Sequence, residues 1–126
     1  MSLRQPAAAE AYQDNLQALV QQLRLNFGRP GLPVIIASLA APEKDRIGRE
    51  FAYRQVVIDA QEKVAAGDAA VRTVPVDGIE RERDGLHYSP SGQRRLGERL
   101  GQAMIELLEQ ESDTLCHSFR VSQKSG

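Results

Sequence analysis

The sequence feature that most constrains the fold is a short apolar run, Val34 to Leu39, which opens with three β-branched side chains. A run in which polar residues do not alternate with apolar ones is typical of a strand covered on both faces, as in a parallel sheet. A second run, Ala70 to Val74, predicts another strand, and Pro75 after it suits a position at the edge of a sheet. Between them, apolar residues at helical spacing predict a helix from about Gly48 to Ala66. Strand, helix and strand in this order imply a right-handed parallel crossover.

Two more helices are expected on either side of this unit. The first runs from Glu10 to Phe27, with its apolar residues on one face, and Gly28 ends it. The other starts after Ser89, a natural N-cap, with Pro90 at the first helical position, and fades near residue 110. The chain therefore predicts the order helix, strand, helix, strand, helix.

This order predicts an α/β fold that is incomplete. A chain of 126 residues can bury one modest core. Because two strands make a poor sheet by themselves, the pattern indicates the C-terminal half of an α/β domain, at residues 10–111. Residues 1–8 are expected to form a frayed leader, and the polar, aperiodic residues 112–126 a flexible tail.

Composition excludes several classes of function. The net charge of −1 and the pI near 6.1 give no sign of a nucleic-acid or anionic membrane partner. No apolar run is long enough to span a bilayer, and no signal-peptide pattern is present, so the chain as written is expected in the cytoplasm. Two distant histidines and one cysteine make no plausible metal-ligand set, and no cofactor is expected.

The strongest candidate for chemistry is the pair Asp84 and His87, in the long charged loop before the last helix. Sites in open parallel sheets form at the carboxyl ends of the strands, where this loop begins. An Asp-x-x-His spacing lets the carboxylate bond one ring nitrogen, so that the other can take a proton from a hydroxyl nucleophile. Taken alone the pattern is also compatible with an ordinary loop that carries a solvated histidine.

The segment from Asp84 to Gln93, with Leu96-Gly97-Glu98-Arg99 after it, closely resembles the last block of the SGNH (GDSL-like) hydrolases. The branch it resembles most is that of the sialate O-acetylesterase-like carbohydrate esterases. Upstream, residues 32–36 look like that family's penultimate core strand, and residues 57–61 like its helix motif, with Ile58-Asp59 where an Arg-Glu pair often stands. Residues 71–79 look like its final strand and loop. The resemblance covers about residues 10–108.

The resemblance implies a three-layer α/β/α fold and hydrolysis of O-acetyl esters on carbohydrates. It makes His87 the general base of a Ser-His-Asp triad and Asp84 its partner. The family's nucleophile lies in an N-terminal Gly-Gln-Ser-Asn-like block, and the sequence contains neither this block nor those of the oxyanion hole. Ser38, at the end of the first strand, is a nucleophile candidate; the alternative is a small residue at a strand end.

Two functions are consistent with these features. The chain is either the C-terminal part of a carbohydrate O-acetylesterase-like hydrolase that is inactive alone, or a non-enzymatic, homodimerising remnant or subunit of a split esterase. An acetylated carbohydrate is the expected ligand in the first case. In the second, the apolar edge at residues 34–39 would lack its neighbour, and an exposed edge invites pairing, so a homodimer through this edge is expected.

Overall fold

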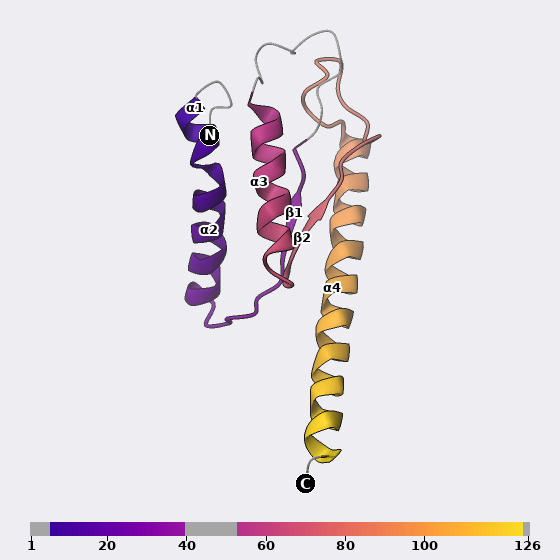
Figure 1. Ribbon diagram of the computed structural model, residues 1–126. Coiled ribbons are helices and arrows are strands. Elements are labelled where there is room, and N and C mark those ends of the chain that lie inside the picture. The colour runs from indigo at the N-terminus through magenta and orange to yellow at the C-terminus, as the bar shows by residue number, and fades with distance from the viewer. Residues whose placement is uncertain (1–5, 40–52, 125–126) are drawn as a thin grey trace.

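The structure is a computed structural model that describes residues 6–39 and 53–124, with side chains at 7–39 and 53–117. Figure 1 shows its elements in chain order. They are α1 (Pro6–Glu10), α2 (Tyr12–Asn26), β1 (Val34–Ala37), α3 (Arg54–Ala66), β2 (Val71–Val74) and α4 (Pro90–Lys124).

The sheet consists, within the described residues, of β1 and β2 paired in parallel. Its register runs from Val34 opposite Val71 to Ala37 opposite Val74. The expected pair of parallel strands connected through a helix is therefore confirmed. Because β1 ends at Ala37 and not at Leu39, Ser38 lies just beyond the strand.

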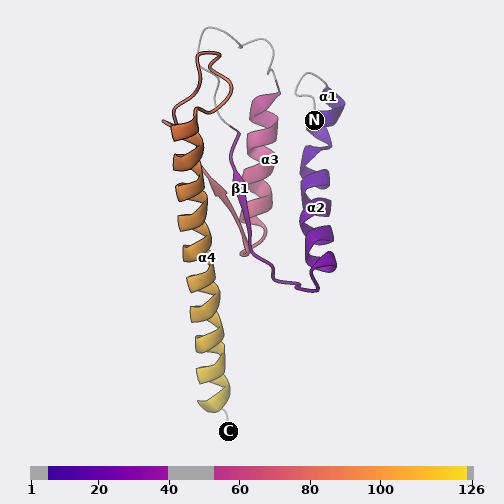
Figure 2. The same ribbon diagram turned by 180° about the vertical axis from the view of Figure 1, so that it is seen from behind.

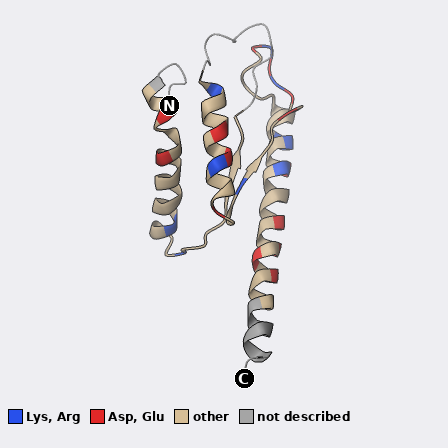
Figure 3. Cartoon of the chain, viewed as in Figure 1, with Lys and Arg blue, Asp and Glu red and all other residues tan. Residues whose placement is uncertain are grey.

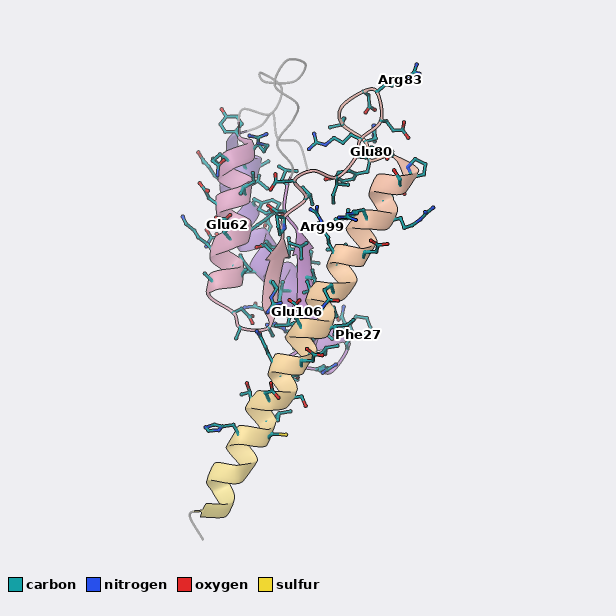
Figure 4. The ribbon with its side chains drawn as sticks, turned by 90° about the vertical axis from the view of Figure 1, so that its right-hand side faces the viewer. Phe27, Glu62, Glu80, Arg83, Arg99 and Glu106 are labelled. Atoms are coloured by element: carbon teal, nitrogen blue, oxygen red, sulfur yellow. The ribbon has the colours of Figure 1, made fainter. Side chains whose placement is uncertain are left out.

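Helices cover both faces of this sheet, with α2 and α3 on one side and α4 on the other (Figures 1 and 2). On the first side Val20, Val64 and Val71 form a buried cluster, against which Val34 and Ile36 of β1 pack. Side chains alternate along a strand, so Arg72 points to the opposite face. There its guanidinium bonds the side chains of Glu106 and Gln110 of α4, at 3.1 and 3.0 Å (Figure 4 labels Glu106).

One partly buried ion pair joins the ends of three elements. Arg24, near the end of α2, bonds both carboxylate oxygens of Asp68, at 2.5 and 3.3 Å, and donates to the carbonyl of Leu32 before β1. Asp68 also accepts from the backbone N–H of Ala70, next to β2. The hydrogen bond from Arg24 lowers the pKa of Asp68; partial burial opposes this shift, and the Ala70 N–H supports it.

The helix ends differ from those predicted. Residues 6–8, expected to fray, belong to α1, and a turn at Ala11 separates α1 from α2. The expected helix start at Gly48 lies outside the described residues, and α3 is described from Arg54.

The last helix is longer than predicted, because α4 continues to Lys124. The expected fading of the helix near residue 110 is therefore wrong. No Gly or Pro interrupts the sequence between residues 102 and 124, and extending an existing helix costs far less than nucleating one. Whether these residues are flexible stays a prediction. No helix among the described residues is long and apolar enough to cross a membrane.

We expect Asp68→Asn to lower the free energy of unfolding by about 1–2 kcal/mol at neutral pH, because the charged hydrogen bonds to Arg24 weaken. The pKa of Asp68 is lowered in the folded state. The pair therefore contributes fully above the usual carboxyl pKa of about 4 and less as the pH falls through the folded-state pKa. Urea unfolding at neutral and acid pH measures both effects.

Asp113→Asn is the control for this experiment, since Asp113 is an exposed carboxylate on α4. We expect a change of about 0.5 kcal/mol or less for it. Equal stability losses in the two variants, or a loss in Asp68→Asn that does not shrink in acid, would contradict the role of the ion pair.

Candidate active site

The loop between β2 and α4, residues 75–89, is fastened to the first turns of α4. The guanidinium of Arg99 donates to the backbone carbonyls of Pro75 and Asp77, at 3.1 and 2.9 Å (Figure 4). Val76 and Ile79 are buried, so the first part of the loop also packs against the body of the protein. The start of the loop therefore has a fixed position relative to α4.

Ser89 and Gly92 hold the second part of the loop. Ser89 caps α4 as predicted, because its hydroxyl oxygen accepts from the N–H of Gly92 at 3.0 Å. A Cβ on Gly92 would lie 2.1 Å from the carbonyl oxygen of Glu80, so this contact needs a glycine. The Ser91 hydroxyl donates to the carboxylate of Glu80 at 2.9 Å. Hydrogen bonds from Ser89 and then Ser91 lower the pKa of Glu80.

Between these anchors, the chain turns in a narrow hairpin. Arg81 and Tyr88 form an isolated antiparallel bridge, and the N–H of Glu82 donates to the carbonyl of His87 at 2.7 Å. Gly85 adopts a positive φ of 68°, which side chains disfavour, and its carbonyl accepts from the Arg81 guanidinium at 3.0 Å. The hairpin brings Asp84 back against His87.

The Asp84 carboxylate binds the His87 ring directly. Its Oδ2 lies 2.6 Å from Nδ1 of the imidazole. Its Oδ1 accepts from the backbone N–H groups of Leu86 and His87, at 2.9 and 3.0 Å. These bonds, that from the His87 side chain first, lower the pKa of Asp84 to about 2. The hydrogen bond that the spacing predicted is therefore present, and the carboxylate is ionised at neutral pH.

An ionised partner at Nδ1 favours the tautomer of His87 that carries its proton on Nδ1. Nε2 then has a free lone pair and can accept a proton. The side chain of His87 is 75% exposed, and no hydrogen bond to Nε2 comes from the described residues. The oriented imidazole of His87 can therefore act as a base toward a group that does not belong to the described residues.

Ser38 lies at the carboxyl end of β1, and its backbone N–H donates to the carbonyl of Val74. Ser38 and His87 both lie in the described part of the chain, and the Ser38 hydroxyl forms no hydrogen bond with His87. The structure brings Asp84 and His87 together and does not join Ser38 to them. In the regions 7–39 and 53–117, no cluster of three His, Cys, Asp or Glu side chains could hold a metal ion.

Sequence reasoning missed the role of Gln61. This buried side chain accepts from the N–H of Leu39 at 3.1 Å and donates to the Tyr12 hydroxyl at 3.0 Å. It thereby ties the segment after β1 to α3 and α2. The available signal was a polar residue adjacent to Ala60 and Val64, on the buried face of α3.

We expect Gly92→Ala to destabilise the protein by about 1–3 kcal/mol, because the new Cβ would force the Glu80 carbonyl and the hairpin away from α4. Gly31→Ala is the control, since nothing lies within 4 Å of its Cβ position. Urea unfolding and amide chemical shifts of residues 80–89 report both effects. Unchanged stability and unchanged shifts in Gly92→Ala would contradict the close contact.

We expect the Asp84 carboxyl carbon to titrate with a midpoint of about 2 in an NMR experiment. In His87→Ala the midpoint should rise but stay below the usual value of about 3.9, because two backbone N–H donors remain. The hydrogen bonds to the carboxylate are complete above the usual pKa and are lost as the pH falls through 2. A midpoint that His87→Ala leaves unchanged would show that the ring contact is not formed in solution.

Comparison with known proteins assigns the family. The family model described as carbohydrate esterase, sialic acid-specific acetylesterase, matches residues 2–106. A protein of known crystal structure from Arabidopsis thaliana is similar to this chain, with 28% sequence identity and a TM-score of 0.68 over 83% of this chain. The match covers 40% of the Arabidopsis chain, so this chain spans less than half of that protein's length. A search of curated proteins finds no match. The chain belongs to the sialic acid-specific acetylesterase family of carbohydrate esterases, which implies an SGNH fold.

Proposed function

We propose that this chain supplies the general base and its orienting carboxylate to a site that hydrolyses O-acetyl esters of carbohydrates, with acetylated sialic acid as the substrate class. The observation that carries the proposal is the contact between Asp84 and Nδ1 of His87. Membership of the acetylesterase family supports the choice of ester and sugar.

In the proposed reaction Nε2 of His87 removes the proton of a serine hydroxyl while the serine oxygen attacks the acetyl carbonyl. The carboxylate of Asp84 stabilises the imidazolium that forms. His87 then gives the proton to the departing sugar oxygen, which leaves an acetyl-serine and a free sugar hydroxyl. Water, deprotonated by the same nitrogen, attacks the acetyl group and releases acetate and the serine.

We propose further that residues 1–126 are inactive by themselves. They contain no Gly-Gln-Ser-Asn-like block. His87 is largely exposed, whereas a working site of this type excludes water around the reacting groups. A single missing oxyanion donor costs about 100-fold or more in rate, and the loss of the nucleophile costs more. Another polypeptide segment would therefore have to supply the serine and the oxyanion hole.

A second candidate function is assembly through the edge of the sheet at residues 34–39. No strand from the described residues pairs with the outer edge of β1. This edge is continuous with Ser38, at the same end of the sheet as the loop of Asp84 and His87. A strand added there in the parallel direction would bring its own carboxyl end to the same end of the sheet as Ser38 and the loop of His87.

The purified chain can be assayed on p-nitrophenyl acetate and on an O-acetylated sialic acid. We expect the activated ester to be cleaved slowly, through the exposed imidazole of His87, and the sugar ester to remain at background. His87→Ala should slow this reaction without removing it, since His117 and the Cys116 thiol are also exposed, and Ser38→Ala should leave the rate unchanged. Equal rates in the chain and both variants would contradict a catalytic His87.

Turnover of the sugar ester would contradict the proposed incompleteness. If that turnover disappeared in both His87→Ala and Ser38→Ala, Ser38 would be the nucleophile.

A further inference from the structure

The peptide group between Gly85 and Leu86 is held at both of its polar ends. Its carbonyl oxygen accepts from the guanidinium of Arg81 at 3.0 Å. Its N–H, which belongs to Leu86, donates to Oδ1 of Asp84 at 2.9 Å. The other carboxylate oxygen of Asp84 lies 2.6 Å from Nδ1 of His87. One chain of hydrogen bonds therefore runs from Arg81 through this peptide group and the carboxylate to the imidazole.

The backbone at Gly85 does not fix this peptide group by itself. Its φ of 68° lies in the left-handed region, and a glycine changes its backbone conformation more readily than any other residue. A rotation of the peptide plane would carry the Leu86 N–H away from the Asp84 carboxylate. The carbonyl and the N–H of a trans peptide point in opposite directions, so a donor bound to the Gly85 carbonyl opposes that rotation.

Arg81 is itself held in the position from which it donates. It forms an antiparallel bridge with Tyr88, so the two side chains lie on the same face of the hairpin. The guanidinium carbon of Arg81 lies 6.0 Å from the centroid of the Tyr88 ring, at the limit of a cation–π contact. Both residues are partly buried and Gly85 is buried, which limits the access of water to the Gly85 carbonyl.

The positive charge of Arg81 adds to the effect of its geometry. Charges of both signs follow one another along the hairpin, from Glu80 to Asp84 (Figure 3). A cation at a carbonyl polarises the whole peptide group, which makes the N–H a stronger donor to the carboxylate. The hydrogen bond from the His87 side chain and then that from the Leu86 N–H lower the pKa of Asp84, as expected when both stabilise the charged form.

We propose that Arg81 is a positioning residue of the candidate site. It acts through the peptide group after Gly85, which holds the carboxylate of Asp84 against the ring of His87. The neutral ring then keeps its proton on Nδ1 and leaves Nε2 open. The inference rests on the proposed function, because the orientation of His87 serves catalysis only if His87 is the general base. The chain of hydrogen bonds can nevertheless be tested without a substrate.

NMR of the nitrogen-labelled whole chain, at a pH where the ring of His87 is neutral, measures the ratio of its two tautomers. Arg81→Met keeps an apolar stem and removes the donor. We expect it to lower the ratio of the Nδ1–H to the Nε2–H form by about threefold or more, because a carboxylate that turns away no longer stabilises a proton on Nδ1. The amide signal of Leu86 should move toward that of an unbonded N–H. Arg81→Lys keeps a cationic donor and should change the ratio less.

Arg95→Met is the matched control, since Arg95 is an exposed arginine on α4, and it should leave the tautomer ratio unchanged. The backbone N–H groups of Glu82 and Ser89 donate across the hairpin, and their signals show whether it stays closed. We expect these two signals to keep their positions in Arg81→Met, because the proposed role concerns one peptide group and not the whole hairpin.

An unchanged tautomer ratio in Arg81→Met, or an equal loss in Arg81→Lys, would overturn the proposal. Movement of the Glu82 and Ser89 signals in Arg81→Met would also overturn it, because Arg81 would then close the hairpin as a whole. Failure of the proposed function would show separately, as a rate of p-nitrophenyl acetate cleavage that His87→Ala leaves unchanged. In that case the tautomer ratio would still report whether Arg81 positions the ring.

Discussion

A parallel pair of four-residue strands has two faces to cover and little surface of its own, and the rest of the described chain is arranged to cover them. Because side chains alternate along a strand, each strand has one face toward α2 and α3 and the other face toward α4. Val71 faces the valine cluster, and its neighbour Arg72 reaches Glu106 and Gln110. The ion pair of Arg24 and Asp68 joins the end of α2 to the segments that lead into both strands.

The candidate site depends on this arrangement because its loop leaves β2 and is anchored to α4. Arg99 binds the carbonyls just after β2, and the capping group of Ser89 and Gly92 binds Glu80. Asp84 and His87 can therefore be exposed and still be oriented relative to each other. Catalysis needs more than this, since a base must also meet its nucleophile in a site that excludes water.

Much of the framework could be predicted from local patterns. The apolar runs around Ile35 and Val71 predicted the strands, and Ser89-Pro90 predicted the start of α4, because strand burial and helix capping are set by a few adjacent residues. The end of α4 could not be predicted in this way. Its polar, aperiodic sequence after residue 110 suggested that the helix fades there, but without a Gly or Pro the helix continues to Lys124.

The sequence by itself determined the pairing of Asp84 with His87, since a separation of three residues around Gly85 lets the carboxylate reach the ring and the adjacent N–H groups. It also determined the family, through the block that follows. Only the tertiary structure decided what these residues face. Contacts between distant segments, such as Gly92 against Glu80 and Gln61 against Leu39, place the loops. These contacts leave the His87 side chain exposed and without a hydrogen bond to Ser38. The position of a loop depends on packing between distant segments, which a local sequence pattern does not predict.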